Sequence, residues 1–500
     1  MASCRSDFNF EASSGKLVFS KDTVYLDTVF KNIGSSTYTL KVYNRSDKNI
    51  AIPTVQLGKG LASKYRMTVD GMTGTEGKIF NNVELLAKDS LFIFIETTAN
   101  ITDANPVDFL YTDQIQFGVG PNLQKVELVT LIQDAVFLYP QKNDDGTTET
   151  LPIGEDQIYG FFLDDNDPVN GNEYELTNEK PYVIYGYAAV SSGKTLNIHP
   201  GARLHFHADS GIIVASGGTL NINGTASTTD AQENEVVFEG DRLEPLYSDV
   251  PGQWGTIWMT SQSTGRIDHL TLKNAVVGLL IENNTGEIAI NNTQIYDCSN
   301  VGLLARNGTI TGKNMVINSA GQAALACNYG GTYNFTHSTF NNNWPSSGQA
   351  AVLLGNYIEG ATPQANPLVA ANFNNCIIYG SNQVEMILDK DENATFNYKF
   401  NNCLIKFNSE AIRDPSNPLY DFTNTALYSD CLIAKNSSQF KPDFFDVNGN
   451  NLIIGQDSAA KEMANPEFTA TAPSDINNVA RPVAPAKADL GAYQSVIFED

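Results

Sequence analysis

The chain has 500 residues, 42% of them hydrophobic, and its 31 basic and 56 acidic side chains give a formal charge of −25. This length exceeds what one compact core supports, so two or more domains or a solenoid are expected. The negative surface repels phosphate backbones and anionic lipid, which argues against nucleic acid as a partner. No apolar run reaches the ~18 residues that would predict a membrane-spanning helix.

The first residues suggest a lipid anchor. In "MASC", two small residues precede Cys4, and the stretch resembles the end of a bacterial lipobox, where cleavage occurs before the cysteine and the thiol carries lipid. The polar segment after it, "RSDFNFEASSGK", is typical of a tether, so residues 1–7 are predicted to be a lipid-anchor tether. The alternative is that Met1 is the native start and this cysteine is incidental.

Residues 8–140 consist of short alternating runs separated by Gly, Asn, Asp and Ser. The runs are "VYLDTVF", "TYTLKVYN", "IAIPTVQL", "YRMTVDG", "SLFIFIETT", "DQIQFGV" and "KVELVTLIQDA". Such spacing predicts an antiparallel β-sandwich. The phrases "STYTLKVYNRSDKNIAIPTVQL" and "VELLAKDSLFIFIE" resemble immunoglobulin-like modules of bacterial envelope proteins, which implies a spacer or binding role.

Residues 141–181 are acidic and rich in turn residues, and we interpret them as a linker and lead-in. Their oxygen-bearing side chains could bind calcium, the one cofactor considered, although the spacing is not that of an EF-hand. A solvated loop is the alternative. The candidate calcium ligands are Asp164, Asp165, Asn166, Asp167 and Asn170.

From residue 182 to 495 the chain repeats itself. One frame recurs at steps of 23, 22, 23, 38, 27 and 28 residues, at Leu270, Thr293, Met315, Ser338, Cys376, Cys403 and Cys431. Two positions later stand Leu272, Ile295, Ile317, Phe340, Ile378, Ile405 and Ile433. The pattern predicts a strand that returns one coil later in the same orientation.

Two further columns support the repeat. Glycine begins a strand at Gly265, Gly286, Gly308 and Gly331, and a second column starts at Val277, Val301, Ala323 and Ala350. Three short strands per coil predict a parallel β-helix of about ten coils. A (β/α) barrel is excluded because no helical segments separate the strands.

The same region resembles known proteins. "VSSGKTLNIHPGARLHFHADSGIIVASGGTLNINGT", "PGQWGTIW" and the closing "ARPVAPAKADLGAYQ" are similar to right-handed parallel β-helix proteins of bacterial surfaces. The predicted fold is therefore all-β, an N-terminal antiparallel immunoglobulin-like sandwich followed by a right-handed parallel β-helix. This order of units after a lipobox-like cysteine resembles surface lipoproteins of the Bacteroidetes envelope.

The repeated cysteines are predicted to fill space. Cys376, Cys403 and Cys431 share a column with Leu, Thr, Met and Ser, and a ligand or nucleophile position would not alternate with such residues. Free cysteine behaves as a small buried hydrophobe.

Two groups of residues are candidates for chemistry. Asp268 and His269, with Arg266 beside them, combine a carboxylate and an imidazole that can do acid–base work. His205, His207 and Asp209 alternate along one strand as zinc ligands could. In both cases a solvated polar face is the alternative, and neither a catalytic group nor a metal is expected.

The predicted contact surface lies in two loops. The 38-residue step contains about 15 extra residues, including Trp344 and Tyr357, and solenoid insertions often form a binding face. A second loop from Glu239 carries Tyr247 and precedes Trp254, which is expected to pack at a coil corner.

We expect a non-enzymatic, lipid-anchored protein of the outer membrane and cell surface, acting as a scaffold or binding subunit of a larger outer-membrane protein assembly. Its partners would be outer-membrane proteins or surface glycans. The alternative is a polysaccharide-binding or polysaccharide-degrading protein on the same β-helix.

Overall fold

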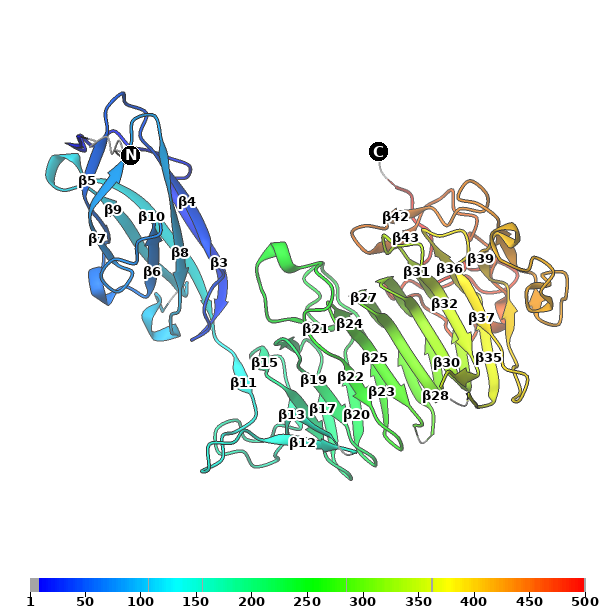
Figure 1. The fold of residues 1–500 in the computed structure, drawn as a ribbon. Helices are drawn as coiled ribbons and strands as arrows, with labels where there is room; N and C mark the ends of the chain where they lie inside the picture. Colours follow the sequence, from blue (N-terminus) through cyan, green and yellow to red (C-terminus); the bar gives the residue numbers. More distant parts are fainter. Residues whose placement is uncertain (1–8, 107, 155, 285, 361–362, 499–500) are drawn as a thin grey trace, which may run out of the picture. The chain divides into compact units, whose positions relative to one another are not determined.

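The computed structural model describes residues 9–106, 108–154, 156–284, 286–360 and 363–498 (Figure 1). Cys4 lies outside the described residues. The chain divides into two compact units, residues 1–135 with 243–245 and residues 136–242 with 246–500. Within the described residues, no helix is long and apolar enough to cross a membrane.

The first unit packs two sheets around one core. One sheet has the order β1-β5-β9-β10-β3, with β7 also on β5, and the other has the order β2-β4-β8-β6. The strands are β1 Glu11–Ala12, β2 Val18–Phe19, β3 Thr23–Phe30, β4 Tyr38–Tyr43, β5 Ile50–Leu57, β6 Tyr65–Val69, β7 Ile79–Leu85, β8 Ser90–Thr97, β9 Leu110–Phe117 and β10 Gln124–Gln133. Alternating residues of both sheets meet inside, as Leu40 and Ile93 do with Ile52 and Leu128.

All seven strands predicted for this unit form. The alternation of apolar residues does not predict β7. Asn81 and Asn82 are both exposed and Asn82 adopts φ 52°, so the alternation is interrupted between Phe80 and Val83. The pairing is mostly antiparallel, but β10 pairs with β3, and β1 with β5, in parallel.

The second unit is a stack of coils whose strands pair in parallel with those one coil away. One ladder contains β11 Val136–Leu138, β15 Tyr182–Ile184, β18 Arg203–Phe206, β21 Val236–Gly240, β24 Leu270–Lys273, β27 Gln294–Cys298, β29 Val316–Ala320, β31 Thr339–Asn342, β36 Ile377–Gly380, β39 Leu404–Lys406 and β41 Leu432–Ala434. We call its sheet the first parallel sheet.

A second, longer sheet holds the other two strands of each coil, and it is parallel except for its first pair, β12 with β13, which is antiparallel. We call it the second parallel sheet. Its strands are β12 Thr150–Ile153, β13 Asp156–Phe162, β14 Glu175–Leu176, β16 Tyr187–Val190, β17 Thr195–Ile198, β19 Gly211–Val214, β20 Thr219–Asn223, β22 Ile257–Met259, β23 Thr264–Asp268, β25 Val277–Glu282, β26 Ile288–Asn291, β28 Val301–Lys313, β30 Ala323–Thr336, β32 Ala350–Gly355, β35 Leu368–Asn374, β37 Met386–Asp389, β38 Lys399–Asn401 and β40 Tyr428–Ser429. The long strands β28 and β30 each pair with two strands of a neighbouring coil. The predicted all-β fold class, a sandwich followed by long parallel sheets, is confirmed.

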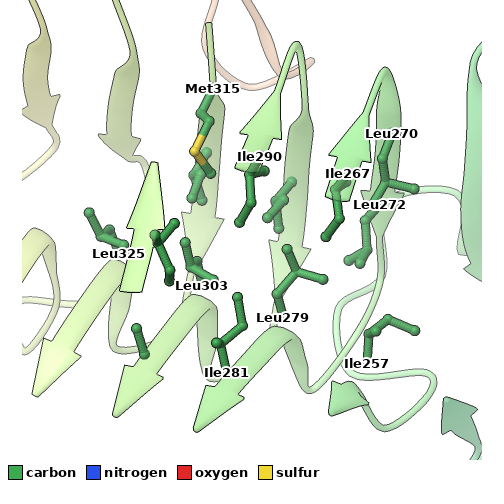
Figure 2. Packing of buried hydrophobic residues seen from close by; sticks show 14 of the residues in the cluster. Ile257, Ile267, Leu270, Leu272, Leu279, Ile281, Ile290, Leu303, Met315 and Leu325 are labelled. Carbon is green, nitrogen blue, oxygen red and sulfur yellow. The ribbon is translucent and has the colours of Figure 1, made fainter. Parts of the chain in front are cut away.

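The predicted register is confirmed at the inward columns. Leu272 pairs with Ile295, and the ladder continues through Ile317, Phe340, Ile378 and Ile405 to Ile433. Two positions earlier, Cys376 and Cys403 are fully buried, Cys431 is half-buried, and all three thiols are free. Figure 2 shows Leu270, Leu272 and Met315 meeting Leu279, Ile281 and Leu303 in the interior.

The residue before each column position turns the corner of the coil. His269, Asn314, Asn375 and Asn402 all have φ between 47° and 55°. Asn, Asp and His are the non-glycine residues that most readily adopt this left-handed conformation. In the repeated phrase "FNNC", the second asparagine therefore makes the turn and the cysteine is the first inward residue. The glycine column holds for Gly286, Gly308 and Gly331, but Gly265 is two residues out of register.

Both ends of the parallel stack differ from expectation. The segment interpreted as a linker, residues 141–181, supplies β12 to β14 and buries Leu151, Phe161 and Leu176. These apolar residues are widely spaced among acidic ones, so they do not produce a recognisable strand pattern in the sequence. Beyond β41 the chain packs on the first parallel sheet, where Leu452 and Tyr493 contact Tyr296 and Val316. This segment contains the antiparallel pair β42 Phe444–Asp446 and β43 Asn451–Ile454, and the helix α1 Pro466–Thr469.

Candidate functional site

An apolar row runs along the outer face of the second parallel sheet. Leu279 and Ile281 point into the core, so Leu280 between them faces outward. The strand pairings align Leu280 with a continuous apolar row, which we call the outer stripe. Among the described residues it comprises Phe162, Ala189, Ile213, Trp258, Leu280, Leu304, Ala326, Leu353 and Ile387.

The outer stripe is reinforced by a neighbouring row. Val277, Val301 and Ala323 pack with Leu280, Leu304, Ala326 and Leu353 in one cluster separate from the main core. Their side chains cover one another, so Leu304 is only 9% exposed, whereas Phe162 and Ile387 at the two ends are 46% and 37% exposed. Near the first end of the row, Ala189 and Ile213 are buried against Leu151 of β12. From Trp258 to Ile387 the row is a flat apolar surface rather than scattered exposed side chains.

A groove adjoins this surface. Its volume is about 410 Å³, and Asp209 is the one charged residue in the described lining, which otherwise consists of Ile158, Tyr159, Tyr187, Gly255, Thr256, Val276 and Val277. Tyr159 is 48% and Val276 40% exposed. Burial raises the pKa of Tyr187, which therefore stays protonated at neutral pH. The groove and the outer stripe together form an extended apolar surface.

A polar border lies beside the outer stripe. The carboxylate of Glu282 accepts hydrogen bonds from Trp258 Nε1 at 3.0 Å and from Arg306 Nη1 at 3.1 Å. An apolar centre with a hydrogen-bonded polar rim is the general composition of a protein–protein interface.

A second site, the polar cleft, lies on the first parallel sheet. It has a volume of about 620 Å³. Its walls are the outward side chains of β24 and β27, the segment 226–235, and C-terminal residues such as Asn450 and Tyr493. Its lining is rich in hydroxyl, amide and carboxylate groups, which suits a ligand with many hydrogen-bonding groups.

Asp297 is the most perturbed acid in the polar cleft. Burial raises its pKa to about 6, although Asn450 Nδ2 donates to Oδ2 at 2.8 Å and Lys273 lies near enough to favour the ionised form. Close by, Lys273 pairs with Glu239 at 2.8 Å, and the Thr271 hydroxyl donates to Glu235 at 3.1 Å. A carboxyl group that titrates near pH 6 is suited to general acid catalysis.

The predicted acid–base group is only partly assembled. Asp268 Oδ1 lies 2.7 Å from His269 Nδ1 and accepts a hydrogen bond from Asn292 at 2.9 Å. Both border a cavity of about 230 Å³, but Arg266 does not line it and donates instead to Asn223 at 2.8 Å. His269 is also a corner residue, which supplies a structural reason for its place.

The predicted metal ligands are divided among different partners. His205 is buried, which lowers its pKa, and lies 3.5 Å from Glu239. His207 pairs with Asp241 at 2.7 Å, which raises its pKa, while Asp209 borders the apolar groove. In the calcium candidate, Asp164 and Asp167 accept backbone N–H groups of their own loop. Over the described ranges, no group of three or more His, Cys, Asp or Glu side chains is placed to hold a metal ion.

The predicted contact residues lie on separate elements. Tyr357, in the hairpin of β33 Tyr357–Ile358 and β34 Gln364–Ala365, donates to Asp389 at 3.1 Å. Tyr247 stacks under Arg242 at 4.0 Å, and Trp344 is half-buried. Among the described residues, no hydrogen bond or ring contact joins these three side chains. Trp254 is buried and donates to the carbonyl of Lys273, consistent with a coil corner.

The outer stripe has a signature in the sequence. "VGLLIEN", "VGLLARN", "AALACN" and "AAVLLGN" are apolar at successive positions, without alternation. Such runs are expected when both faces of a strand carry apolar side chains.

No protein-family model and no curated protein matches the chain. Among solved structures, it is similar to the E. coli chaperone DraB (15% identity, TM-score 0.17), covering 24% of this chain and 57% of that one. It is also similar to the periplasmic chaperone SfaE (12% identity, TM-score 0.16; 23% and 58%) and to a PapD-like domain of human CEP192 (11% identity, TM-score 0.16; 27% and 97%). The chain thus spans less than two thirds of either chaperone, and any functional conclusion rests on its own residues.

Proposed function

We propose that this chain is a non-enzymatic scaffold or binding subunit of a larger outer-membrane protein assembly. It is a surface lipoprotein of the Bacteroidetes type, anchored through lipid on Cys4. The observation that carries the proposal is the outer stripe with its adjoining groove. Ala189 and Ile213 are covered by Leu151, so the accessible part of the outer stripe runs from Trp258 to Ile387. These six rungs at the ~4.8 Å spacing of paired strands extend over roughly 24 Å, which is comparable with the width of a standard protein interface.

Charge supports a protein partner with a basic rim. Residues 136–500 contain 18 basic and 41 acidic side chains, so most of the net charge of the chain belongs to the second unit. Such a field directs a basic partner toward the unit and repels acidic ones. The apolar surface would then supply the affinity and the surrounding carboxylates the selectivity.

The test combines cross-linking and charge insertion. A photo-cross-linking residue at Leu353 in the outer stripe is expected to join the chain to one defined outer-membrane protein in intact cells. The double variant Leu280→Lys/Leu353→Lys should lower recovery of that partner by at least ~10-fold, because two ammonium groups would be desolvated in the interface. Recovery is measured by quantitative mass spectrometry of the purified complex.

The matched control is Leu246→Lys. Leu246 is 80% exposed and lies outside the outer stripe, so this variant adds a charge without touching the apolar surface. Equal loss of the partner in the control, or full retention in the double variant, would refute the docking role. Circular dichroism of each variant establishes that the fold is retained.

The polar cleft supports a second candidate function, binding or cleavage of a surface polysaccharide. The specific observation is the buried carboxyl group of Asp297 among hydroxyl and amide groups. If a polysaccharide is cleaved there, Asp297→Asn should reduce the rate at least ~100-fold, and the wild-type rate should fall above pH 6 as this acid ionises. Reducing-end release measures the rate. Asp457→Asn, at an exposed acid outside the described lining of the polar cleft, should leave it unchanged.

A further inference from the structure

The outer face of the β2-β4-β8-β6 sheet in the first unit carries an exposed aromatic patch. Phe92 and Phe94 stand on β8 between the core residues Leu91, Ile93 and Ile95, and are 44% and 43% exposed. Their rings are stacked with centroids 6.4 Å apart. Neither ring faces the core, so the packing of the unit does not explain why two phenylalanines occupy these positions.

The strand pairings extend this patch. Lys41 lies opposite Phe92, and Val18, 46% exposed, lies opposite Tyr43. We call the four apolar residues Val18, Tyr43, Phe92 and Phe94, together with Lys41 and Arg45, the aromatic-cationic face. On the edge strand β6, by contrast, the outward Arg66 forms an ion pair with Glu96 of β8.

The two cations of this face have no acidic partner among the described residues. Lys41 Nζ lies 4.9 Å from the centre of the Phe92 ring, and the Arg45 guanidinium lies 4.3 Å from that of Tyr43. Their neighbours Lys48 and Lys88 are instead paired with Glu11 and Asp47. The positive charge of the face is therefore available to an external anion.

The position of the N-terminal segment suggests what this face meets. Asn49 donates to the carbonyl of Asn9 at 3.5 Å, and the same short loop, residues 44–49, carries Arg45. Only four residues lie between Cys4 and Asn9, so the five residue steps span at most ~18 Å of extended chain. A lipid on Cys4 would thus hold the Arg45 end of the face close to a bilayer, a step that rests on the anchor proposed above.

We infer that the aromatic-cationic face lies against an anionic membrane surface. Aromatic rings enter the headgroup region while lysine and arginine side chains reach lipid phosphates, and the two effects combine in one face here. The first 135 residues carry 13 basic and 15 acidic side chains, so this unit is nearly neutral and its cations are not outweighed by local negative charge. In this proposal the first unit is the part of the protein that contacts the membrane.

The first experiment measures partitioning of the full chain, without lipid, into phosphatidylglycerol vesicles. Each basic residue near an anionic membrane contributes about 1 kcal/mol, so Lys41→Ala/Arg45→Ala should lower the partition coefficient about 30-fold. Lys59→Ala/Lys125→Ala removes the same charge from exposed positions after β5 and on β10, in the other sheet of the unit, and should change the partition coefficient far less. Vesicles of phosphatidylcholine alone should bind weakly. No partitioning, or equal effects of the two double variants, would overturn the inference.

The second experiment locates the contact. Phe94→Trp is compared with Tyr25→Trp, because Tyr25 is 67% exposed on the other sheet. With brominated phosphatidylglycerol, the emission added by the indole introduced at position 94 should at least halve, while that added at position 25 should persist. Equal quenching at both positions would show that the first unit does not contact the membrane through the aromatic-cationic face, and would refute the inference.

The two proposals can fail separately. Mass spectrometry of Cys4 in the native protein tests the lipid anchor alone. If Cys4 is unlipidated but partitioning depends on Lys41 and Arg45, the lipid anchor is refuted and membrane contact through the aromatic-cationic face is supported. Lipidated Cys4 with no quenching at position 94 would support the lipid anchor and refute membrane contact through the aromatic-cationic face. Preferential binding of an acidic protein over vesicles would also refute membrane contact.

Discussion

Replacing Phe373 by alanine is expected to lower the free energy of unfolding of the parallel stack by about 3–5 kcal/mol. Phe373 is fully buried in an aromatic column, 5.3 Å from Phe335 and 4.9 Å from Phe400, between ring centres. Truncation removes contacts with both neighbours and leaves a cavity that stacked coils, held in register by their hydrogen bonds, cannot close. Denaturant unfolding followed by circular dichroism measures the loss.

Cys403→Ala is the matched control one coil further along. Its thiol is buried, and burial raises its pKa well above the ordinary value, so it remains a neutral, apolar group. Removing one sulfur atom should cost about 1 kcal/mol. If Cys403→Ala were as destabilising as Phe373→Ala, the thiol column would have a role beyond filling space.

The inward columns could be predicted because each coil repeats one frame. Leu270, Thr293, Met315 and Ser338 differ in chemistry but follow one another at steps of 22 or 23 residues, and a position that recurs in every coil must occupy one stacked column. The left-handed corner residues, such as Asn375 and Asn402, belong to the same frame. The sequence therefore specified register as well as fold class.

The outer stripe and the polar cleft could not be predicted in the same way. In "VGLLIEN" both faces of the strand are apolar, so period-two alternation does not tell Leu279 inside from Leu280 outside. The cleft depends on Asn450 and Tyr493, which return to β27 across about 150 to 200 residues of chain. Contacts between such distant segments follow from tertiary packing and produce no periodic pattern in the local sequence.

Glu385→Gln is expected to remove most of the loss of stability between pH 7 and pH 9. Glu385 is fully buried and burial raises its pKa to about 8, although the amide N–H of Asn382 donates to it at 2.6 Å. The pKa is higher in the folded than in the unfolded chain, so folding favours the neutral form. Stability should fall as pH rises above the unfolded value of about 4.5 and level off above pH 8, by about 5 kcal/mol in total.

The pH window separates Glu385 from the other perturbed acid. Asp297 has its pKa near 6, so its titration contributes mainly below pH 7, whereas more than half of the Glu385 molecules in the folded state remain protonated until pH 8. Of these two acids, both contribute between pH 5 and pH 7, whereas the slope between pH 7 and pH 9 belongs to Glu385, and denaturant midpoints at pH 5, 7 and 9 measure the two parts. Glu392→Gln, whose side chain is 83% exposed, should leave the profile unchanged. A slope between pH 7 and pH 9 that persists in Glu385→Gln would mean that this carboxyl group is already ionised in the folded chain, its charge balanced by the neighbouring Lys406.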